Sequence, residues 1–195
     1  INYRMGPEAK HPAALEDIEK VYRRLLPHHK ASSIGIYGCS AGGALTAQIA
    51  AWLPSKGLPQ PGAIGIFGAG GVRFTSGDSA YIAGYIDGSF PPPGQAKGDM
   101  GRGYFEGADQ NDPIISPALH PSVVAKFPPT LLITGTRAMD MSPAIVTNSA
   151  LIKAQVPSTL IVGEGMGHCY IYNSELPEAL DAHQAAVDFF RANLK

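Results

Sequence analysis

Residues 34–42 read IGIYGCSAG, and this stretch decides the fold. A short apolar run leads into Gly38-Cys39-Ser40-Ala41-Gly42, which fits the pattern G-x-S-x-G, and an Ala-rich stretch of helical character follows as far as Trp52. A serine on a sharp turn between a strand and a helix is typical of a nucleophile elbow. Such a turn needs small neighbours if the serine oxygen is to project. The motif alone is weak, because glycine-rich turns of this kind also serve packing only.

Phosphate binding is the main alternative for this turn. The sequence contains neither G-x-x-x-x-G-K-[ST] nor a G-x-G-x-x-G followed by an acid about 20 residues later, so the alternative fails in detail. A second glycine run at Gly65–Gly71 (GIFGAGG) opens no periodic helix. We expect close backbone packing there.

Apolar runs alternate with amphipathic stretches along most of the chain, a pattern typical of a mostly parallel α/β sheet flanked by helices. Strands are expected at residues 34–38, 63–67, 130–134 and 158–162, and helices at 12–26, 41–52, 142–155 and from 177 onward. Ser142 is expected to cap its helix. The last helix is expected to bury Leu180, Ala186, Val187, Phe190 and Leu194.

The periodic pattern breaks down after Gly70, in a segment rich in glycine and proline. A structureless loop of that length is unusual in a compact domain, so this segment is expected to be an insertion that lines a pocket or caps the core. We therefore divide the chain into a first core segment at 1–69, the insertion at 70–112, and a second core segment at 113–195.

Composition narrows the class of protein. The 195 residues carry a formal net charge of −1, with 45% hydrophobic and 16% charged residues. These values exclude a disordered segment and argue against a nucleic-acid surface or a polybasic membrane surface. No apolar run reaches the length of a membrane-spanning helix. The two cysteines, Cys39 and Cys169, are too few for a disulfide scaffold and are expected to be small packing residues.

A serine nucleophile needs a base, and the base needs an orienting acid. In hydrolases of this kind the chain order is serine, acid, histidine. His168 lies in the loop GEGMGH after the last expected strand, and Asp140 is the only carboxylate in the loop after the preceding strand. Asp140 could instead serve the start of its helix, and Glu164 is the alternative acid. Since an open α/β sheet places its site at the carboxyl ends of its strands, Ser40, Asp140 and His168 are expected to meet.

Metal chemistry finds little support, because H-E-x-x-H and C-x-x-C are absent and His28 and His29 are adjacent. No metal and no cofactor are expected.

Taken together, these motifs resemble the hormone-sensitive-lipase-like family of α/β-hydrolases, which includes bacterial carboxylesterases. The similarity covers nearly the whole chain. It rests on the segments NYRMGPE (2–8), HPAALED (11–17), GCSAGG (38–43), DPIISP (112–117), PPTLLITG (128–135) and EGMGH (164–168). The resemblance implies an α/β-hydrolase fold with a cap insertion.

Three departures from the family pattern stand out. Cys39 replaces the usual aspartate of the elbow, and Ala138 stands where many members carry the acid, so the role passes to Asp140. The family's H-G-G-G motif, which supplies further oxyanion contacts, would lie upstream of residue 1. In the family's sheet a further strand would lie between a strand at Ile1–Tyr3 and the strand that leads to Ser40. We therefore expect N-terminal strands that are missing from this chain, supplied by an upstream segment or a companion chain.

The resemblance implies a serine carboxylesterase that hydrolyses short- to medium-chain esters with Ser40, His168 and Asp140. Ala41 and Gly42 are expected at the oxyanion, and Phe74 and Tyr81 are expected to line the substrate pocket, with Tyr85, Ile86 and Phe90 as further candidates. A small-molecule ester is the expected partner, and neither nucleic acid nor a membrane span is expected. A homodimer is left open, and the expected location is cytoplasmic. The alternatives are a ligand receptor on the same fold and a serine amidase or peptidase.

Overall fold

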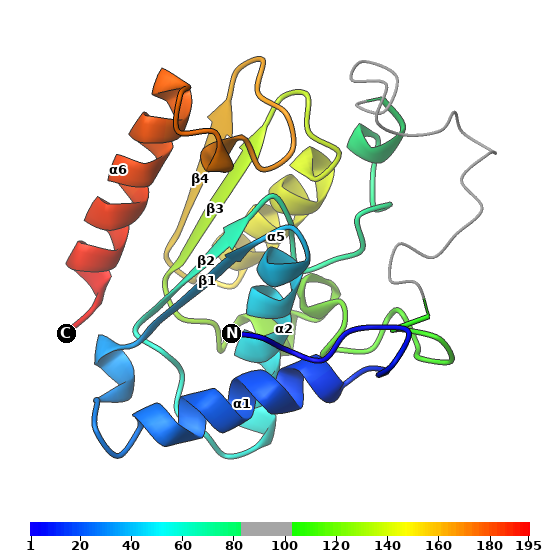
Figure 1. Ribbon diagram of the computed structural model, residues 1–195, viewed down its shortest axis with the longest axis vertical. Coiled ribbons are helices and arrows are strands. Elements are labelled where there is room, and N and C mark those ends of the chain that lie inside the picture. Colours follow the sequence, from blue (N-terminus) through cyan, green and yellow to red (C-terminus); the bar gives the residue numbers. More distant parts are fainter. Residues whose placement is uncertain (83–102) are drawn as a thin grey trace.

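The computed structural model describes residues 1–82 and 103–195, which build a four-stranded parallel sheet between helices (Figure 1). The strands are β1 (Gly35–Cys39), β2 (Ala63–Phe67), β3 (Thr130–Gly135) and β4 (Ser158–Gly163), in the spatial order β1-β2-β3-β4. The register pairs Gly35 with Ala63, Ile64 with Thr130, and Thr130 with Ser158. The predicted α/β class and all four predicted strands are confirmed, with ends that differ by one residue at most.

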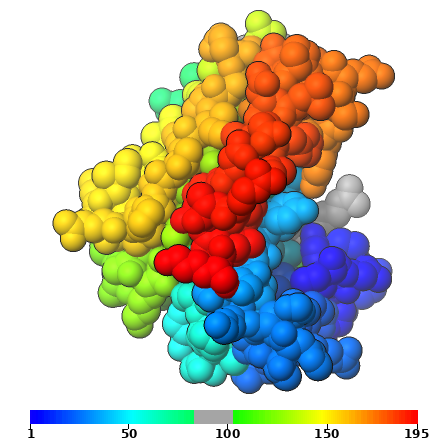
Figure 2. Space-filling model, turned by 90° about the vertical axis from the view of Figure 1, so that its left-hand side faces the viewer, coloured from blue at the N-terminus to red at the C-terminus, as the bar shows by residue number. Residues whose placement is uncertain are grey.

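Helices cover both faces of the sheet. The helices are α1 (Ala13–Leu25), α2 (Ala41–Ser55), α4 (Pro121–Val124), α5 (Met141–Lys153) and α6 (Pro177–Asn193), with short 3-10 turns at Ala31–Ser33, Pro117–Leu119 and Tyr170–Tyr172. In Figure 1, α6 stands on one side of the strands and α2 and α5 stand on the other, while α1 crosses below α2. Figure 2 looks directly onto α6, which runs diagonally along the outer surface.

The alternation of side chains along β3 explains this sandwich. Leu132 packs with Ala47 of α2 and Leu151 of α5, whereas Leu131 and Ile133 pack on the opposite face in the cluster that includes α6. Successive residues of a strand point to opposite faces, so an uninterrupted apolar run such as this one is buried on both sides.

The prediction of which residues of α6 face the core was wrong in part. Leu180 is 55% exposed and Val187 is 48% exposed, whereas Ala179 and Ala182 are fully buried. Ala186 and Phe190 do pack against the core, as expected. Small alanines let α6 lie close to the sheet, and the larger apolar residues at Leu180 and Val187 fall on the solvent side.

Two further local expectations fail. Residues 1–3 form no strand, and within the described residues β1 pairs only with β2. Ser142 does not cap α5, because that helix begins one residue earlier, with Asp140 in the N-cap position. Ser142 instead exchanges hydrogen bonds with Ser79.

The insertion expected at 70–112 is described only at its two ends, residues 70–82 and 103–112. Tyr85, Ile86 and Phe90 therefore lie outside the described residues. None of the helices within residues 1–82 and 103–195 combines the length and the apolar character needed to cross a membrane.

Candidate active site

Ser40 occupies the tight turn between β1 and α2. Its backbone has φ 58° and ψ −122°, a conformation that a residue with a side chain rarely adopts. The Ser40 N–H donates a 3.0 Å hydrogen bond to the Phe67 carbonyl at the end of β2, which fixes the turn to the sheet. Strain of this kind persists only where the surroundings hold it, and it is typical of functional sites.

The glycines of the turn are crowded at two positions. A Cβ atom at Gly38 would lie 2.5 Å from the Gly42 carbonyl carbon, and one at Gly43 would lie 2.5 Å from the Phe67 carbonyl oxygen. A Cβ atom at Gly42 meets nothing within 4 Å among the described residues. The motif predicts that Gly38 and Gly42 have no room for a side chain. In this structure the two crowded positions are Gly38 and Gly43.

Ser40, His168 and Asp140 form one hydrogen-bonded chain at the carboxyl ends of β1, β4 and β3. Ser40 Oγ lies 2.9 Å from His168 Nε2, and His168 Nδ1 lies 2.6 Å from Asp140 Oδ1. Asp140 is fully buried, whereas the His168 side chain is 31% exposed. A buried carboxylate on Nδ1 leaves Nε2 free to exchange a proton with the serine, since the ring then carries its hydrogen on Nδ1.

Thr134 completes the surroundings of the acid, and sequence reasoning missed it. Thr134 Oγ1 donates a 2.6 Å hydrogen bond to Asp140 Oδ2, so each carboxylate oxygen has a partner. Thr134 is the penultimate residue of β3 and is buried. A polar residue directly after the apolar run Leu131–Ile133, at the end of the strand that leads to Asp140, was the signal that the sequence offered.

Glu164, the alternative acid, lies exposed in the loop after β4. The described hydrogen bonds join the His168 ring to Asp140 and Ser40, and none joins it to Glu164. The geometry therefore favours Asp140 over Glu164.

The two cysteines are joined by a disulfide, with their Cα atoms 6.3 Å apart. The expectation that they are only small packing residues was wrong. Cys39 precedes Ser40 and Cys169 follows His168, so the residues that flank the candidate nucleophile and the candidate base are covalently linked across 130 positions of sequence. Each cysteine is the sequence neighbour of a candidate catalytic residue, and this signal in the sequence could have indicated that the two cysteines lie close together.

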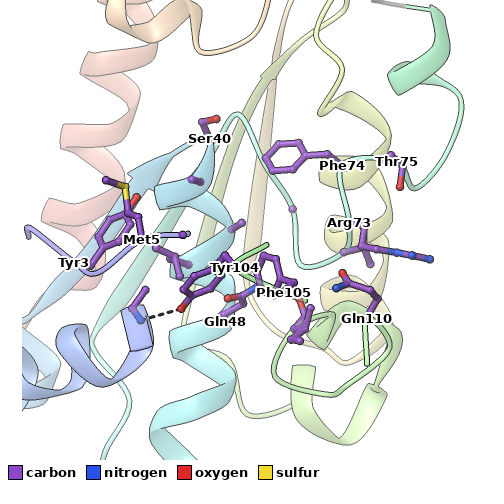
Figure 3. Close-up of a pocket in the computed structure, with 18 of the residues that line it drawn as sticks. Tyr3, Met5, Ser40, Gln48, Arg73, Phe74, Thr75, Tyr104, Phe105 and Gln110 are labelled. Carbon is purple, nitrogen blue, oxygen red and sulfur yellow. Dashed lines mark hydrogen bonds between the residues drawn. The ribbon is translucent and has the colours of Figure 1, made fainter. Parts of the chain in front are cut away.

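A cavity of about 630 Å³ opens beside Ser40 (Figure 3). It is lined mainly by apolar and aromatic side chains, among them Phe74, Tyr104 and Phe105. Figure 3 shows Ser40 at its upper end, with the Phe74 ring pointing toward it. Phe74 also contacts the His168 ring edge to face, at a centroid distance of 6.2 Å. Cavities of this size and lining commonly hold small organic ligands.

Polar side chains also line this cavity. Gln48, Arg73 and Gln110 line it, and Gln48 is 4% exposed. The Gln48 amide donates a 3.3 Å hydrogen bond to the Ile115 carbonyl, while its Oε1 has no partner within the described part of the chain.

The remaining predicted site residues are placed as follows. Ala41 lines the cavity at the start of α2, where its N–H belongs to the unsatisfied first turn of the helix. Phe74 lines the cavity as well. Gly42 borders a smaller hollow of about 100 Å³ instead, and Tyr81, which is 51% exposed, is not among the residues that line the larger cavity.

Within residues 1–82 and 103–195, no three His, Cys, Asp or Glu side chains gather as a metal-ligand set.

A model of the α/β-hydrolase fold family matches residues 1–172. The chain belongs to this family. It is 28% identical over 193 residues to an acetyl-hydrolase of Streptomyces hygroscopicus, a match that covers 98% of this chain and 63% of that protein.

Solved structures of esterases are similar to this one. The esterase E25 superposes with a TM-score of 0.89 and 32% identity, covering 100% of this chain and 59% of that one. An esterase from the bacterial hormone-sensitive lipase family gives a TM-score of 0.87 and 26% identity, covering 100% of this chain and 65% of that one. The predicted family resemblance is confirmed, and the chain spans about three fifths of the length of these relatives.

Proposed function

We propose that this chain carries the catalytic residues of a serine carboxylesterase. The observation that supports the proposal most directly is the hydrogen-bonded chain from Ser40 Oγ through His168 to the buried Asp140. Serine, histidine and acid in this arrangement are recognised by geometry and roles on many folds. The similarity to proteins named as esterases and as an acetyl-hydrolase supports ester bonds as the target.

In the acylation half, Ser40 Oγ attacks the ester carbonyl carbon while His168 Nε2 takes its proton. The carbonyl π electrons move to the oxygen, and the Ala41 N–H at the start of α2 is available to that oxyanion. Collapse of the tetrahedral intermediate breaks the bond to the alcohol oxygen, which receives the proton from His168. The acid portion stays bound to Ser40 as an ester.

In the deacylation half, His168 accepts a proton from water, whose oxygen attacks the acyl carbon. Collapse returns the proton to Ser40 Oγ and releases the carboxylic acid. Throughout, Asp140 holds the imidazole tautomer and stabilises the imidazolium. Burial of Asp140 and its bond from Thr134 hold its carboxylate in one orientation.

We further propose short- to medium-chain esters as substrates. A cavity of about 630 Å³ with a largely apolar lining accepts an acyl or alcohol group of a few carbons, and the Phe74 ring narrows the space next to Ser40. A receptor without activity is less consistent with the intact chain of hydrogen bonds, because ligand binding alone does not require it.

Hydrolysis of p-nitrophenyl acetate, butyrate and octanoate tests the proposal. We expect turnover that is fastest for the shorter esters, with a burst of p-nitrophenol if deacylation is slow. Ser40→Ala is expected to lower kcat by about 10⁴-fold or more. The exposed Ser122 of α4 provides the matched control, Ser122→Ala, which should retain the full rate.

An unchanged rate in Ser40→Ala would exclude the proposed nucleophile. Faster cleavage of the matching p-nitroanilide than of the ester would favour an amidase instead. Absence of any turnover, together with tight binding of an ester or its acid product, would favour the receptor alternative.

A further inference from the structure

The Cys39–Cys169 disulfide lies against the reacting groups. Cys169 Sγ is 3.6 Å from His168 Nε2, the nitrogen that faces Ser40. The two half-cystines adjoin the nucleophile and the base along the chain, so the disulfide spans the gap between the elbow and the loop after β4. A cross-link at this point sets the distance between two chemically active side chains as well as adding stability.

The loop that carries His168 is already tied to the loop that carries Asp140. The Arg137 N–H donates a 3.0 Å hydrogen bond to the Met166 carbonyl, and the Gly165 N–H donates a 2.8 Å hydrogen bond to Thr136 Oγ1. The loops that carry His168 and Asp140 are therefore held together by one backbone–backbone hydrogen bond and one bond from a backbone N–H to a side-chain hydroxyl.

The elbow, residues 38–42, is hydrogen-bonded to a different part of the structure. Its backbone bonds to β2 through the Ser40 N–H and the Phe67 carbonyl. In the described parts of the chain, no backbone hydrogen bond joins residues 38–42 to residues 163–170. The links between them are the Ser40–His168 hydrogen bond itself and the disulfide.

We propose that the Cys39–Cys169 disulfide is a positioning element of the active site, which holds the His168 loop in register with Ser40. When the bond is opened, the glycine-rich loop at 163–169 gains freedom, and the fraction of molecules with His168 at hydrogen-bonding distance from Ser40 falls. A displacement of about 1 Å in a reacting group can cost on the order of 10²-fold in rate. This inference rests on the proposed function of Ser40 and His168.

Gly68 provides the space that the disulfide needs. It follows β2 with φ +55°, and a Cβ atom there would lie 2.6 Å from Cys169 Sγ and 3.0 Å from Cys39 Sγ. Any larger residue at this position would push on both sulfurs. The absence of a side chain at Gly68 therefore leaves room for the disulfide beside the end of β2.

A small reductant can reach the disulfide through Cys169, which is only partly buried. Cys39, by contrast, is buried, with 8% of its surface exposed. A dithiol such as dithiothreitol attacks one sulfur as a thiolate and forms a mixed disulfide, which its second thiol resolves. The protein gains two electrons and two protons as two cysteine thiols, and the dithiol becomes a cyclic disulfide. Because these 195 residues contain two cysteines, the reagent can reduce one disulfide in them, the Cys39–Cys169 bond.

The test compares the oxidised protein, the dithiol-treated protein and the double variant Cys39→Ala/Cys169→Ala. Alkylation with iodoacetamide, read by intact mass, first counts the thiols: none should react before treatment and two should react after it. Kinetics with p-nitrophenyl butyrate follow, at a temperature at which circular dichroism shows all three forms to be folded.

We expect kcat to fall by about 10- to 100-fold on reduction and to recover on reoxidation, while KM changes by less than about twofold. The double variant should show the lower kcat and no response to the dithiol. A disulfide that only stabilises the fold would shift the melting temperature and leave kcat of the folded protein unchanged, and that result would overturn the proposal. Thiols that react without reductant would overturn it as well.

Failure of the proposed function gives a different result. If the oxidised protein hydrolyses no ester, or if Ser40→Ala keeps its rate, then the assignment of the nucleophile fails. If the oxidised protein hydrolyses esters through Ser40 and reduction leaves kcat unchanged, the inference about the disulfide alone fails.

Discussion

Thr134 Oγ1 donates a hydrogen bond of 2.6 Å to Asp140 Oδ2, the carboxylate oxygen that His168 does not use. The hydroxyl comes from β3 and the carboxylate from the N-cap position of α5, so the turn between them folds back on its own strand. Both side chains are buried. The acid is thereby held in one rotamer with neither oxygen left unpaired, as buried polar groups require.

Thr134→Val tests this support directly. Valine keeps the shape of threonine and removes the hydroxyl, which leaves Asp140 Oδ2 buried without a donor at a cost of about 1–3 kcal/mol. We expect roughly a tenfold loss of kcat in ester hydrolysis, because the freed carboxylate no longer orients His168 as well. Thr134→Ser retains a hydroxyl and is the control, which should stay within about twofold of the parent. Equal rates for the valine and serine variants would argue against a role for the hydroxyl.

Asp140→Asn separates the two candidate acids. The amide retains the shape but cannot stabilise an imidazolium and favours the wrong tautomer, and the same exchange in a chymotrypsin-type triad costs about 10⁴-fold in kcat. We expect a loss of that order here, whereas the exposed Glu164→Gln should leave kcat unchanged. The measurement is kcat on p-nitrophenyl butyrate for both variants. Loss of activity in Glu164→Gln alone would reassign the acid.

Much of this architecture is predictable from local pattern. Ser40, Asp140 and His168 each follow an apolar strand, and parallel strands bring their carboxyl ends to one edge. That rule places three side chains together without any knowledge of their contacts. It requires only that the strands be recognised, and short runs such as Thr130–Gly135 are clear in the sequence.

The features that escaped prediction depend on contacts between distant residues. Thr134 reads as an ordinary strand residue until the Asp140 turn folds onto it. Cys39 and Cys169 lie 130 positions apart, and only the tertiary fold brings them to bonding distance. The exposed Leu180 and Val187 fall outside the buried face of α6 because apolar residues occur on more than one side of that helix, and spacing alone cannot choose between the sides.

Gly43→Ala should destabilise the fold even though alanine favours helices. By helix propensity alone the exchange would stabilise α2 by roughly 0.5–1 kcal/mol. The new Cβ would lie 2.5 Å from the Phe67 carbonyl oxygen and 2.8 Å from Ala69 Cβ, and neither backbone can move without disturbing β2. Overpacking of this kind costs about 1–3 kcal/mol, which at roughly 2–4 °C per kcal/mol lowers the melting temperature by several degrees. A melting temperature equal to or above that of the parent, measured by circular dichroism, would contradict the steric argument.

His11 should make stability depend on pH. Its ring packs on Phe105 and Tyr104, at centroid distances of 5.6 Å and 6.2 Å, and its Nδ1 is buried without a partner among the described residues. Burial lowers the pKa of the His11 imidazole below its ordinary value, while the charge of Asp112 opposes this shift. The folded state therefore holds His11 neutral at a pH at which the unfolded chain already binds a proton.

The sign of the pH effect follows from this difference. The contribution of His11 to stability is complete above the unfolded pKa of about 6.5 and is lost as the pH falls from there toward the lower folded pKa. We expect the melting temperature of the parent to drop between pH 7.5 and pH 5.5 by more than that of His11→Gln, which carries no titrating group at this position. The exposed His29 provides the control, and His29→Gln should follow the parent. If His11→Gln instead follows the parent over this range, the buried imidazole is not the group that couples folding to pH.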